Sequence, residues 1–327
     1  MTQTVVDLVS QVFPDSQVVT SMGNHETFPC NNIPPNDIDF GPHDPQWLYS
    51  GLSDVFKNWY PEEQLQQIRE NGTYSMKLQP GFRIVSINSP MCLTYNFFIW
   101  MDWSDPGGML KWLSEQLLEA EQAGDKVHIL SHAPPGNMDC LGAWGREYSK
   151  IINRFESTVV GQFYGHTHND EFQIFYDTET NTRASNIAYV TPSVTTHENL
   201  NPSYRIYTID SGHEKATYRV LDSETYVFNL TAANMAGEDK LPNWYRLVSV
   251  KEDLDVNPLY PSSWDDLVRR MAIDDELYKK WVRFFNKDAE GHDGIFNGVG
   301  KRERLCTLLT TSNLDLRKCD EILGAEH

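Results

Sequence analysis

The chain has 327 residues, 40% of them hydrophobic and 22% charged, so it is long enough for a large core and its composition excludes wholesale disorder. The formal net charge is −19, and the first 250 residues carry 15 basic and 30 acidic side chains, a net charge of −15. Acidity of this size argues against DNA or RNA as a ligand, because polyanions are repelled.

Helical and extended patterns alternate over the first half of the chain. The apolar spacing of Val5, Leu8 and Val12 predicts a first helix. Asp105 is expected to cap a later helix with Pro106 at its first position, and a Pro80-Gly81 turn predicts a β-hairpin. The expected helices are 4–12, 46–59, 62–70, 106–123 and one near 147–156, and the expected strands are 17–22, 73–78, 82–88, 126–131 and 158–164, with a long loop over 31–45.

The second half begins with strands and ends with helices. The expected strands are 171–177, 186–191, 203–210, 216–221 and 225–229, and the expected helices are 261–271, 275–286 and 301–311. Beyond about residue 232 no further strand is expected. This order predicts a mixed α/β fold in which two packed sheets are flanked by helices. We expect two domains, 1–232 with the sheets and 233–327 as a helical lobe.

Three short polar motifs each follow an expected strand. They are GNHE at 23–26, SHAPPG at 131–136 and GHTH at 165–168. Loops from neighbouring strands converge at the strand ends of mixed sheets, where binding sites gather. A single histidine is more often structural than a ligand, and GHTH alone is compatible with a tight turn. Three such motifs in succession are hard to obtain by chance.

The residue types in these motifs suit a metal centre. His166 and His168 are two residues apart, so in an extended segment both rings would point to one side and could bind a metal such as zinc. His132 is a further candidate nitrogen ligand, and Asn24 can offer a carbonyl oxygen. His25 would point elsewhere and stay free to act as a general acid.

GNHE, SHAPPG and GHTH in this order resemble the calcineurin-like metallophosphoesterase superfamily. Longer segments resemble its acid sphingomyelinase family, namely GNHETFPCNNIPP, GDKVHILSHAPPG, QFYGHTHNDEFQIFYD, NLNPSYRIYTID and LDSETYVFNLTAAN. The resemblance implies two zinc ions between the sheets. It assigns Asn24, His132 and His166 to one metal and His168 to the other, and it makes His25 the group that protonates the leaving oxygen while water attacks phosphorus in line.

The chain departs from the family pattern upstream of GNHE. The family has an Asp-x-His motif and a Gly-Asp-x-x-x-His-Asp motif there, which supply the bridging aspartate, further ligands and a second histidine, and neither occurs in this sequence. The family's secretion signal and saposin-like domain do not occur either. We therefore expect a truncated form that keeps ligands for about one zinc ion and is inactive, or nearly so, by itself.

The leading functional hypothesis is hydrolysis of sphingomyelin to ceramide and phosphocholine at a membrane surface. The alternatives are a nucleotide phosphodiesterase of the sphingomyelinase-like branch and a non-catalytic short isoform. The resemblance implies the lysosomal lumen or the extracellular space as the location. The sequence shows neither a signal peptide nor a run near the ~20 apolar residues of a membrane helix. No protein partner is expected.

The cysteine pairing and two sequons also follow this resemblance. The family pairs its cysteines at places that match Cys92–Cys140 and Cys306–Cys319, which leaves Cys30 free. Asn-x-Thr sequons at Asn71 and Asn229 mark two candidate glycosylation sites.

Two further features have open interpretations. Glu26 could hydrogen-bond a ligand histidine or could be a plain surface carboxylate. The aromatic stretch Phe97, Phe98, Ile99, Trp100 and Trp103 could face lipid, but we expect it to belong to the core, because large exposed apolar patches are uncommon.

Overall fold

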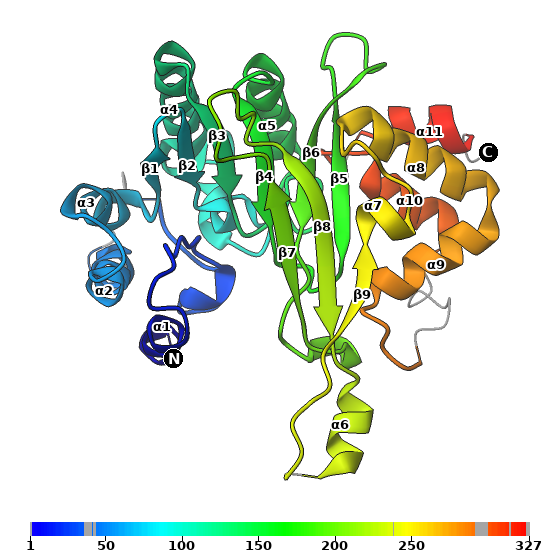
Figure 1. The fold of residues 1–327 in the computed structure, drawn as a ribbon. Helices are drawn as coiled ribbons and strands as arrows, with labels where there is room; N and C mark the ends of the chain where they lie inside the picture. The colour runs from blue at the N-terminus through cyan, green and yellow to red at the C-terminus, as the bar shows by residue number, and fades with distance from the viewer. Residues whose placement is uncertain are drawn as a thin grey trace.

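The computed structural model describes residues 2–35, 41, 44–237, 239–291, 300–313 and 315–324. It shows the predicted mixed α/β fold, with two sheets flanked by helices (Figure 1). The larger sheet has the strand order β1-β2-β3-β4-β6-β5. Its inner strands run parallel, and the edge strands β1 and β5 are antiparallel to their neighbours. These strands are β1 Tyr74–Gln79, β2 Phe82–Ser86, β3 Lys126–Leu130, β4 Val159–Tyr164, β5 Glu171–Tyr176 and β6 Ala184–Val190.

The smaller sheet is antiparallel, with the order β7-β8-β9. Its strands are β7 Ser203–Ile209, β8 Val220–Val227 and β9 Tyr245–Ser249. Helices α2 and α3 lie beyond the β1 edge of the large sheet, whereas α8 to α11 lie beyond its β5 edge (Figure 1). The helices are α1 Thr2–Val12, α2 Gln46–Phe56, α3 Glu62–Asn71, α4 Met109–Ala123, α5 Gly142–Arg154, α6 Leu230–Ala236, α7 Val250–Asp253, α8 Pro261–Ile273, α9 Asp275–Phe285, α10 Lys301–Leu308 and α11 Arg317–Leu323.

The large sheet separates two hydrophobic cores. Along β5, Phe175 belongs to the core beneath α4 and α5, while its neighbours Ile174 and Tyr176 belong to the other core, as the two-residue period of a strand requires. The second core joins β5 and β6 to the small sheet and to α8 and α9. The division into domains at 232/233 stays a prediction.

The expected strand at 17–22 is wrong, because this segment has no strand partner. The hydroxyls of Tyr60 and Tyr74 lie 2.7 and 2.9 Å from the Thr20 amide nitrogen. Tyr74 and Ser86 in turn donate to the Thr20 carbonyl at 2.7 and 2.9 Å. Side-chain hydroxyls thus satisfy the backbone groups that a sheet ladder would otherwise pair.

Two further expectations about strands are wrong. The segments 216–221 and 225–229 are not separate strands, because β8 runs through the polar residues 222–224 and pairs with β7 along its length. Strand β9 lies beyond residue 232, where no strand was expected, and it completes the small sheet by pairing with β8. The short segment Tyr245–Ser249 is held by this pairing and has little extended pattern of its own.

The helix expected at 106–123 begins later than predicted. Pro106–Gly108 forms a 3-10 turn, and α4 starts at Met109 because Gly107 and Gly108 both have left-handed φ angles, of 65° and 64°. The Asp105 carboxylate still caps the helix, since it accepts hydrogen bonds from the amides of Leu110 at 2.7 Å and Lys111 at 3.0 Å.

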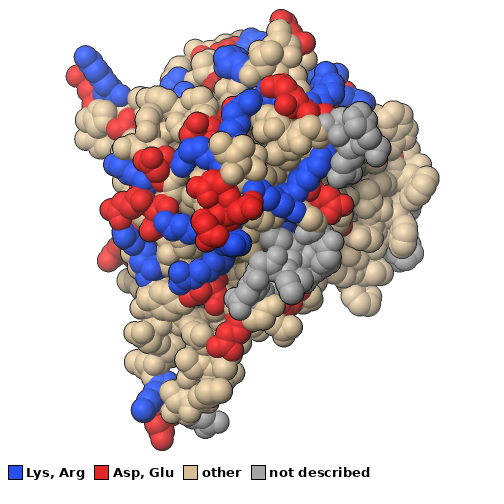
Figure 2. Space-filling view, turned by 90° about the vertical axis from the view of Figure 1, so that its right-hand side faces the viewer, with Lys and Arg blue, Asp and Glu red and all other residues tan. Residues whose placement is uncertain are grey.

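The face formed by the C-terminal helices carries charges of both signs in alternation (Figure 2). Ion pairs within and between these helices account for the pattern, for example Arg270–Asp266, Lys301–Asp275 and Arg302–Asp320. The described residues of this face therefore form no basic stripe of the kind that follows a nucleic acid backbone. Among the described residues, no helix has the length and apolar character that a membrane crossing needs.

We expect the stability of the fold to fall on acidification because His128 is buried neutral in β3. Its Nε2 lies 2.6 Å from the Tyr218 carbonyl, and burial lowers the pKa of His128 to about 4 against the opposing effect of that hydrogen bond. The unfolded chain binds a proton near pH 6.5, so this contribution is complete above that pH and is lost as the pH falls towards 4. From pH 7 to pH 5 the loss is about 2 kcal/mol.

Urea unfolding of the wild type and of His128→Gln at both pH values measures this contribution, because glutamine can still donate to the Tyr218 carbonyl. The difference in unfolding free energy between pH 7 and pH 5 should shrink by about 2 kcal/mol in the variant. The exposed His213 provides the matched control His213→Gln, which should behave as wild type. An unchanged pH dependence in His128→Gln would contradict the prediction.

Candidate metal centre

The loops that follow β3 and β4 carry two of the three motifs and lie side by side. The strands pair in parallel up to Leu130 and Phe163, and the Gly165 amide donates to the His132 carbonyl at 2.9 Å. The third motif forms a 3-10 turn over Asn24–Glu26. This turn approaches His132 so closely that a Cβ atom on Gly23 would lie 3.2 Å from the imidazole ring. Glycine at this position therefore allows the first motif to meet the second.

Three of the predicted ligands meet at one point. Asn24 Oδ1 lies 2.6 Å from His132 Nε2, and His166 Nδ1 lies 3.2 Å from the same nitrogen. Two ligands that are about 2.0–2.1 Å from one tetrahedral zinc ion lie about 3.3–3.4 Å apart. The donor atoms would have to separate by less than about 1 Å to admit a metal ion. The donor set, one amide oxygen and two imidazole nitrogens, therefore fits a zinc-like ion.

The environment keeps His132 in the neutral form that a metal ligand requires. Burial, with smaller contributions from the neighbouring His166, His25 and His168, lowers the pKa of His132 to about 3. A neutral imidazole presents a lone pair without first losing a proton, so metal binding at His132 would compete with protons only under strongly acidic conditions.

Asp139 belongs to this cluster, although the motifs did not point to it. Its Oδ2 lies 3.1 Å from His166 Nε2, on the opposite side of the ring from the Nδ1 atom that faces His132. The hydrogen bond from His166 holds the pKa of Asp139 below its usual value, with a smaller contribution from Tyr95. A carboxylate in this position fixes the tautomer and orientation of a ligand histidine. The available signal was its place in the loop after β3, as the only acidic residue between His132 and Glu147.

We expect Asp139→Asn to weaken zinc binding by about 10–100-fold, because the carboxylate no longer holds the His166 ring with Nδ1 towards the other donors. Competition with a chromogenic chelator measures the affinity. The matched control is Asp7→Asn, at an exposed position of α1. A zinc affinity equal to that of wild type would show that Asp139 does not position His166.

The GHTH segment is not extended, so the expectation that His166 and His168 point to one side is wrong. Both residues have left-handed φ angles, of 74° and 65°, and the Thr167 amide donates to the Gly165 carbonyl at 2.9 Å. This tight turn sends the two rings to different neighbours. His168 packs edge-on against His197 with ring centroids 5.5 Å apart, whereas His166 joins the three-donor cluster. His197, the neighbour of His168, is the second residue near the motifs, after Asp139, that the motifs themselves did not indicate.

His25 and Glu26 have distinct surroundings. The His25 side chain is exposed, and its Nδ1 lies 3.5 Å from the Sγ atom of Cys30, the free cysteine. The Glu26 carboxylate accepts the Gly23 amide at 2.8 Å. Glu26 was expected either to hydrogen-bond a ligand histidine or to be a plain surface carboxylate. Its contact fits neither expectation, because the side chain closes the GNHE turn itself. His25 thus remains open to a ligand next to the donor cluster.

The described residues contain no cluster of three or more histidine, cysteine, aspartate or glutamate side chains that could hold a metal. The three-donor cluster reaches three ligands only by including the amide of Asn24. In the described part of the chain, the carboxylate that contacts this cluster is that of Asp139, which approaches His166 from the far side.

The other sequence-predicted sites are placed as follows. The structure joins Cys92 to Cys140 and Cys306 to Cys319, each with Cα atoms 5.0 Å apart. Asn71 ends α3, and Asn229 caps α6 by accepting the Ala232 amide at 2.7 Å. Both asparagines are half-buried. Whether either carries a glycan stays a prediction.

The aromatic stretch after β2 corrects the expectation of core packing. Ile99 is buried, but Phe97, Trp100 and Trp103 are among the most exposed large apolar side chains, and Phe98 is half-buried. The reason is local, since a 3-10 turn over Phe97–Trp100 points one apolar side chain inward and the others outward.

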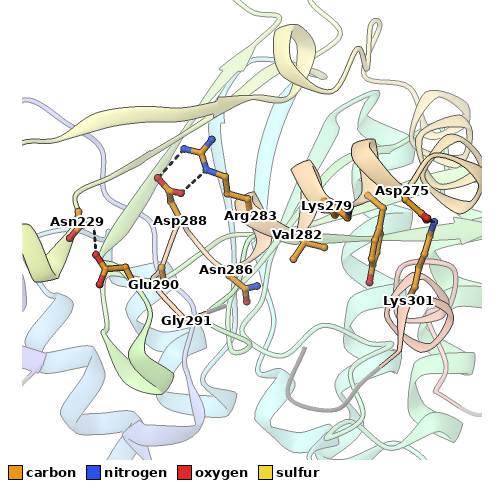
Figure 3. A pocket seen from close by; sticks show the side chains of 12 residues that line it. Asn229, Asp275, Lys279, Val282, Arg283, Asn286, Asp288, Glu290, Gly291 and Lys301 are labelled. Atoms are coloured by element: carbon orange, nitrogen blue, oxygen red, sulfur yellow. Dashed lines mark hydrogen bonds and ion pairs between the residues drawn. The ribbon is translucent and has the colours of Figure 1, made fainter. Parts of the chain in front are cut away.

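A cavity of about 830 Å³ lies along α9, away from the motif histidines (Figure 3). The ion pairs Arg283–Asp288 and Lys301–Asp275 line it, and Asn229 and Glu290 approach each other at one end. None of the described residues that line it is a histidine or a cysteine. Its lining residues stand on both sides of 292–299, which lie outside the described part of the chain, so we assign no ligand to it.

Comparison with known proteins places this geometry in a family. A model of the calcineurin-like phosphoesterase family matches residues 2–170. The chain is 40% identical over 284 residues to a sphingomyelin phosphodiesterase of Bos taurus, which covers 87% of this chain and 45% of the relative. It is 34% identical over 314 residues to sphingomyelin phosphodiesterase 2 of Caenorhabditis elegans, which covers 95% of this chain and 50% of the relative.

A third relative has a different substrate in its name. The chain is 31% identical over 293 residues to a cyclic GMP-AMP phosphodiesterase of Rattus norvegicus, with 85% of this chain and 62% of the relative covered. The chain spans about half the length of the sphingomyelin phosphodiesterases it matches. Because the family model covers more than half of its residues, the chain belongs to the calcineurin-like phosphoesterase family.

Proposed function

We propose that this chain carries part of the active site of a zinc-dependent phosphodiesterase that hydrolyses sphingomyelin to ceramide and phosphocholine. The observation that carries the proposal is the convergence of Asn24, His132 and His166 on one point. The similarity to sphingomyelin phosphodiesterases, at 40% identity over most of the chain, supports the substrate.

Each residue of the site would have a defined task. Asn24, His132 and His166 would hold the metal, whose chemistry is to neutralise charge on the phosphoryl oxygens. Asp139 would keep the His166 ring in the ligating orientation. The exposed His25 would donate a proton to the leaving oxygen of the substrate, so that the leaving group departs as a neutral alcohol.

The chain by itself is expected to turn over slowly. A two-metal site holds the attacking and the leaving oxygen between two fixed charges, and the described residues collect three donors for only one metal. His168, assigned to a second metal by resemblance, packs against His197, and the described residues form no group of three or more histidine, cysteine, aspartate or glutamate side chains that could hold that metal. Without the second charge, little fixes the phosphoryl group for in-line attack.

Release of phosphocholine from sphingomyelin tests the proposal, with zinc at acidic pH and His166→Ala as the control. The chain alone should show no activity above that control. Fusing the matching upstream segment of a sphingomyelin phosphodiesterase should raise turnover, and His25→Ala or His166→Ala in the fusion should abolish it. Rapid zinc-dependent hydrolysis by the chain alone would show that the ligands are misassigned. An inactive fusion would contradict the sphingomyelin assignment.

A nucleotide phosphodiester is the second candidate substrate. The similarity to a cyclic GMP-AMP phosphodiesterase, at 31% identity over 85% of the chain, favours it. A substrate panel on the same fusion separates the two, because faster release of nucleotide than of phosphocholine would select the second candidate. A chain that binds zinc but stays inactive in every form would instead be a non-catalytic relative.

We also propose an oxidising compartment, the lysosomal lumen or the extracellular space. Two disulfides in one chain are typical of proteins from such compartments. The sequons at Asn71 and Asn229 are consistent with passage through the secretory pathway. Mass spectrometry of the protein from its native source would show glycans and both disulfides.

A further inference from the structure

Exposed apolar side chains gather on three loops next to the metal centre. On the loop after β2, Trp100 is 82% exposed, Phe97 72% and Trp103 62%. Phe28 follows the GNHE motif at 85% exposure, and Met138 follows the SHAPPG motif at 79%. We call this set of five side chains the aromatic rim. An apolar group of this size on the surface marks an interaction site more often than a random feature.

Hydrogen bonds and a disulfide hold the three loops together. Asn32 accepts the Phe97 amide at 3.0 Å, and Asn96 donates to the Ile33 carbonyl at 3.0 Å, which joins the first loop to the second. The Thr94 amide donates to the Asp139 carbonyl at 2.7 Å, and the Cys92–Cys140 bond lies beside it, which joins the second loop to the third. The rim is thus presented on a fixed frame.

The same frame is continuous with the metal centre. Asp139 is the neighbour of Met138 in the chain, and its carboxylate contacts His166. Asn31 accepts a hydrogen bond at 2.6 Å from the amide of Asn24, one of the three donors. A ligand surface that covers the rim would therefore lie against the opening of the site, with the exposed His25 between them in the first loop.

The three loops contain no lysine or arginine. Neither lysine nor arginine occurs in 24–35, 84–110 or 133–141, whereas Glu26, Asp102, Asp105 and Asp139 are acidic. An anionic lipid surface attracts lysine and arginine and would be repelled here. Tryptophan and phenylalanine side chains favour the interfacial region of a bilayer, and tryptophan faces attract quaternary ammonium groups such as choline.

The geometry points to the aromatic rim as a docking surface for zwitterionic bilayers that present choline headgroups. This inference rests on the proposed function, because a membrane lipid as substrate requires the site to reach a membrane. Docking through the rim would bring the donor cluster and His25 to the headgroup layer. No attraction between opposite net charges takes part, so binding to zwitterionic vesicles should be insensitive to salt.

Cosedimentation with phosphatidylcholine vesicles measures the docking without turnover, so a failure of the inference is distinguishable from a failure of the proposed function. The triple variant Phe97→Ser/Trp100→Ser/Trp103→Ser should partition onto the vesicles at least about tenfold less than wild type. The matched control Ile273→Ser/Leu316→Ser, at exposed apolar positions of the C-terminal helices, should bind as wild type. Thermal melting should be unchanged in both variants, because the altered side chains are exposed.

Two further measurements complete the test: binding to vesicles of different lipid composition, and the oligomeric state of the protein. Binding should persist at high salt and should fall when phosphatidylglycerol replaces part of the phosphatidylcholine. Tighter binding to the anionic vesicles, equal loss in the control variant, or no binding to phosphatidylcholine would overturn the inference. So would a wild-type dimer that the triple variant converts to a monomer, since the rim would then be a contact between two copies of the chain.

Discussion

We expect zinc to stabilise this chain and replacement of His132 by alanine to abolish that stabilisation. His132 Nε2 is the atom that both other donors approach, with Asn24 Oδ1 at 2.6 Å and His166 Nδ1 at 3.2 Å. Without it, the remaining two donors no longer share a neighbour. The affinity should therefore fall by more than the roughly 10–100-fold that follows the loss of an outer hydrogen-bond partner.

Thermal or chemical unfolding with and without zinc measures this effect without any turnover. Zinc at about 100 times its dissociation constant should stabilise the wild type by about 2.7 kcal/mol, and His132→Ala should show no such gain at the same concentration. His213→Ala is the matched control, because His213 is an exposed histidine paired with Asp210 away from the motifs. It should keep the full gain.

His168→Ala distinguishes the three-donor cluster from a cluster of all the motif histidines. Because His168 faces His197, its loss should leave the zinc stabilisation close to that of wild type. An equal loss in His132→Ala and His168→Ala would mean that His168 joins the same metal. Full zinc stabilisation of His132→Ala would show that the three donors do not form the site.

The two strands that lead to SHAPPG and GHTH could be predicted because their signals are local. Segments such as Lys126–Leu130 and Val159–Tyr164 are short apolar runs bounded by turn residues, and tertiary packing did not override them. The motifs at their ends then had to lie close together, because parallel neighbouring strands end on the same side of a sheet.

The predictions that were wrong concern features that depend on tertiary contacts or on local backbone angles. The segment 17–22 has the composition of a strand, but hydroxyls from Tyr60 and Tyr74, 40 and 54 residues away, satisfy the Thr20 amide. The directions of the His166 and His168 side chains follow from left-handed φ angles within a tight turn. No residue pattern in the sequence predicts these φ angles.

Asp139 and the aromatic rim were missed for a related reason. A carboxylate seven residues after His132 has no fixed direction until other contacts fix the conformation of its loop. Here Cys92–Cys140 and the Thr94–Asp139 hydrogen bond fix that loop. Composition also could not tell that Trp100 and Trp103 face outward, since aromatic residues are usually buried and only the turn around Ile99 decides their direction.

Replacement of Asp170 by alanine is expected to lower the free energy of unfolding by about 3–5 kcal/mol. Asp170 is the second residue after GHTH and forms a buried ion pair with Arg205 of β7. The Arg205 side chain is 3% exposed. It also accepts the Thr225 hydroxyl of β8 at 2.6 Å, and its amide donates to the Phe285 carbonyl of α9 at 3.1 Å. The Asp170 side chain therefore connects the GHTH turn to the small sheet. The Asp170 backbone connects the same turn to the C-terminal helices.

The cost arises from the arginine that is left behind. Burial alone would lower the pKa of Arg205, but Asp170 and Tyr207 raise it above its usual value, so the guanidinium stays charged. In Asp170→Ala this buried charge has no counter-charge, which is more costly than the loss of the pair as a whole. Replacing both partners, as Asp170→Leu/Arg205→Met, should therefore destabilise the protein less than Asp170→Ala alone.

Denaturant unfolding of Asp170→Leu, of Arg205→Met and of the double variant gives the coupling between Asp170 and Arg205 directly. Asp315→Ala, which breaks the exposed Asp315–Arg317 pair, should leave the midpoint unchanged, because such pairs contribute little. Zinc binding provides an independent readout, since a GHTH turn released from both sheets would no longer hold His166 at His132. If Asp170→Ala were as stable as Asp315→Ala and bound zinc as wild type does, the turn would be held by its own backbone hydrogen bonds, and the buried pair would have no part in placing the metal ligands.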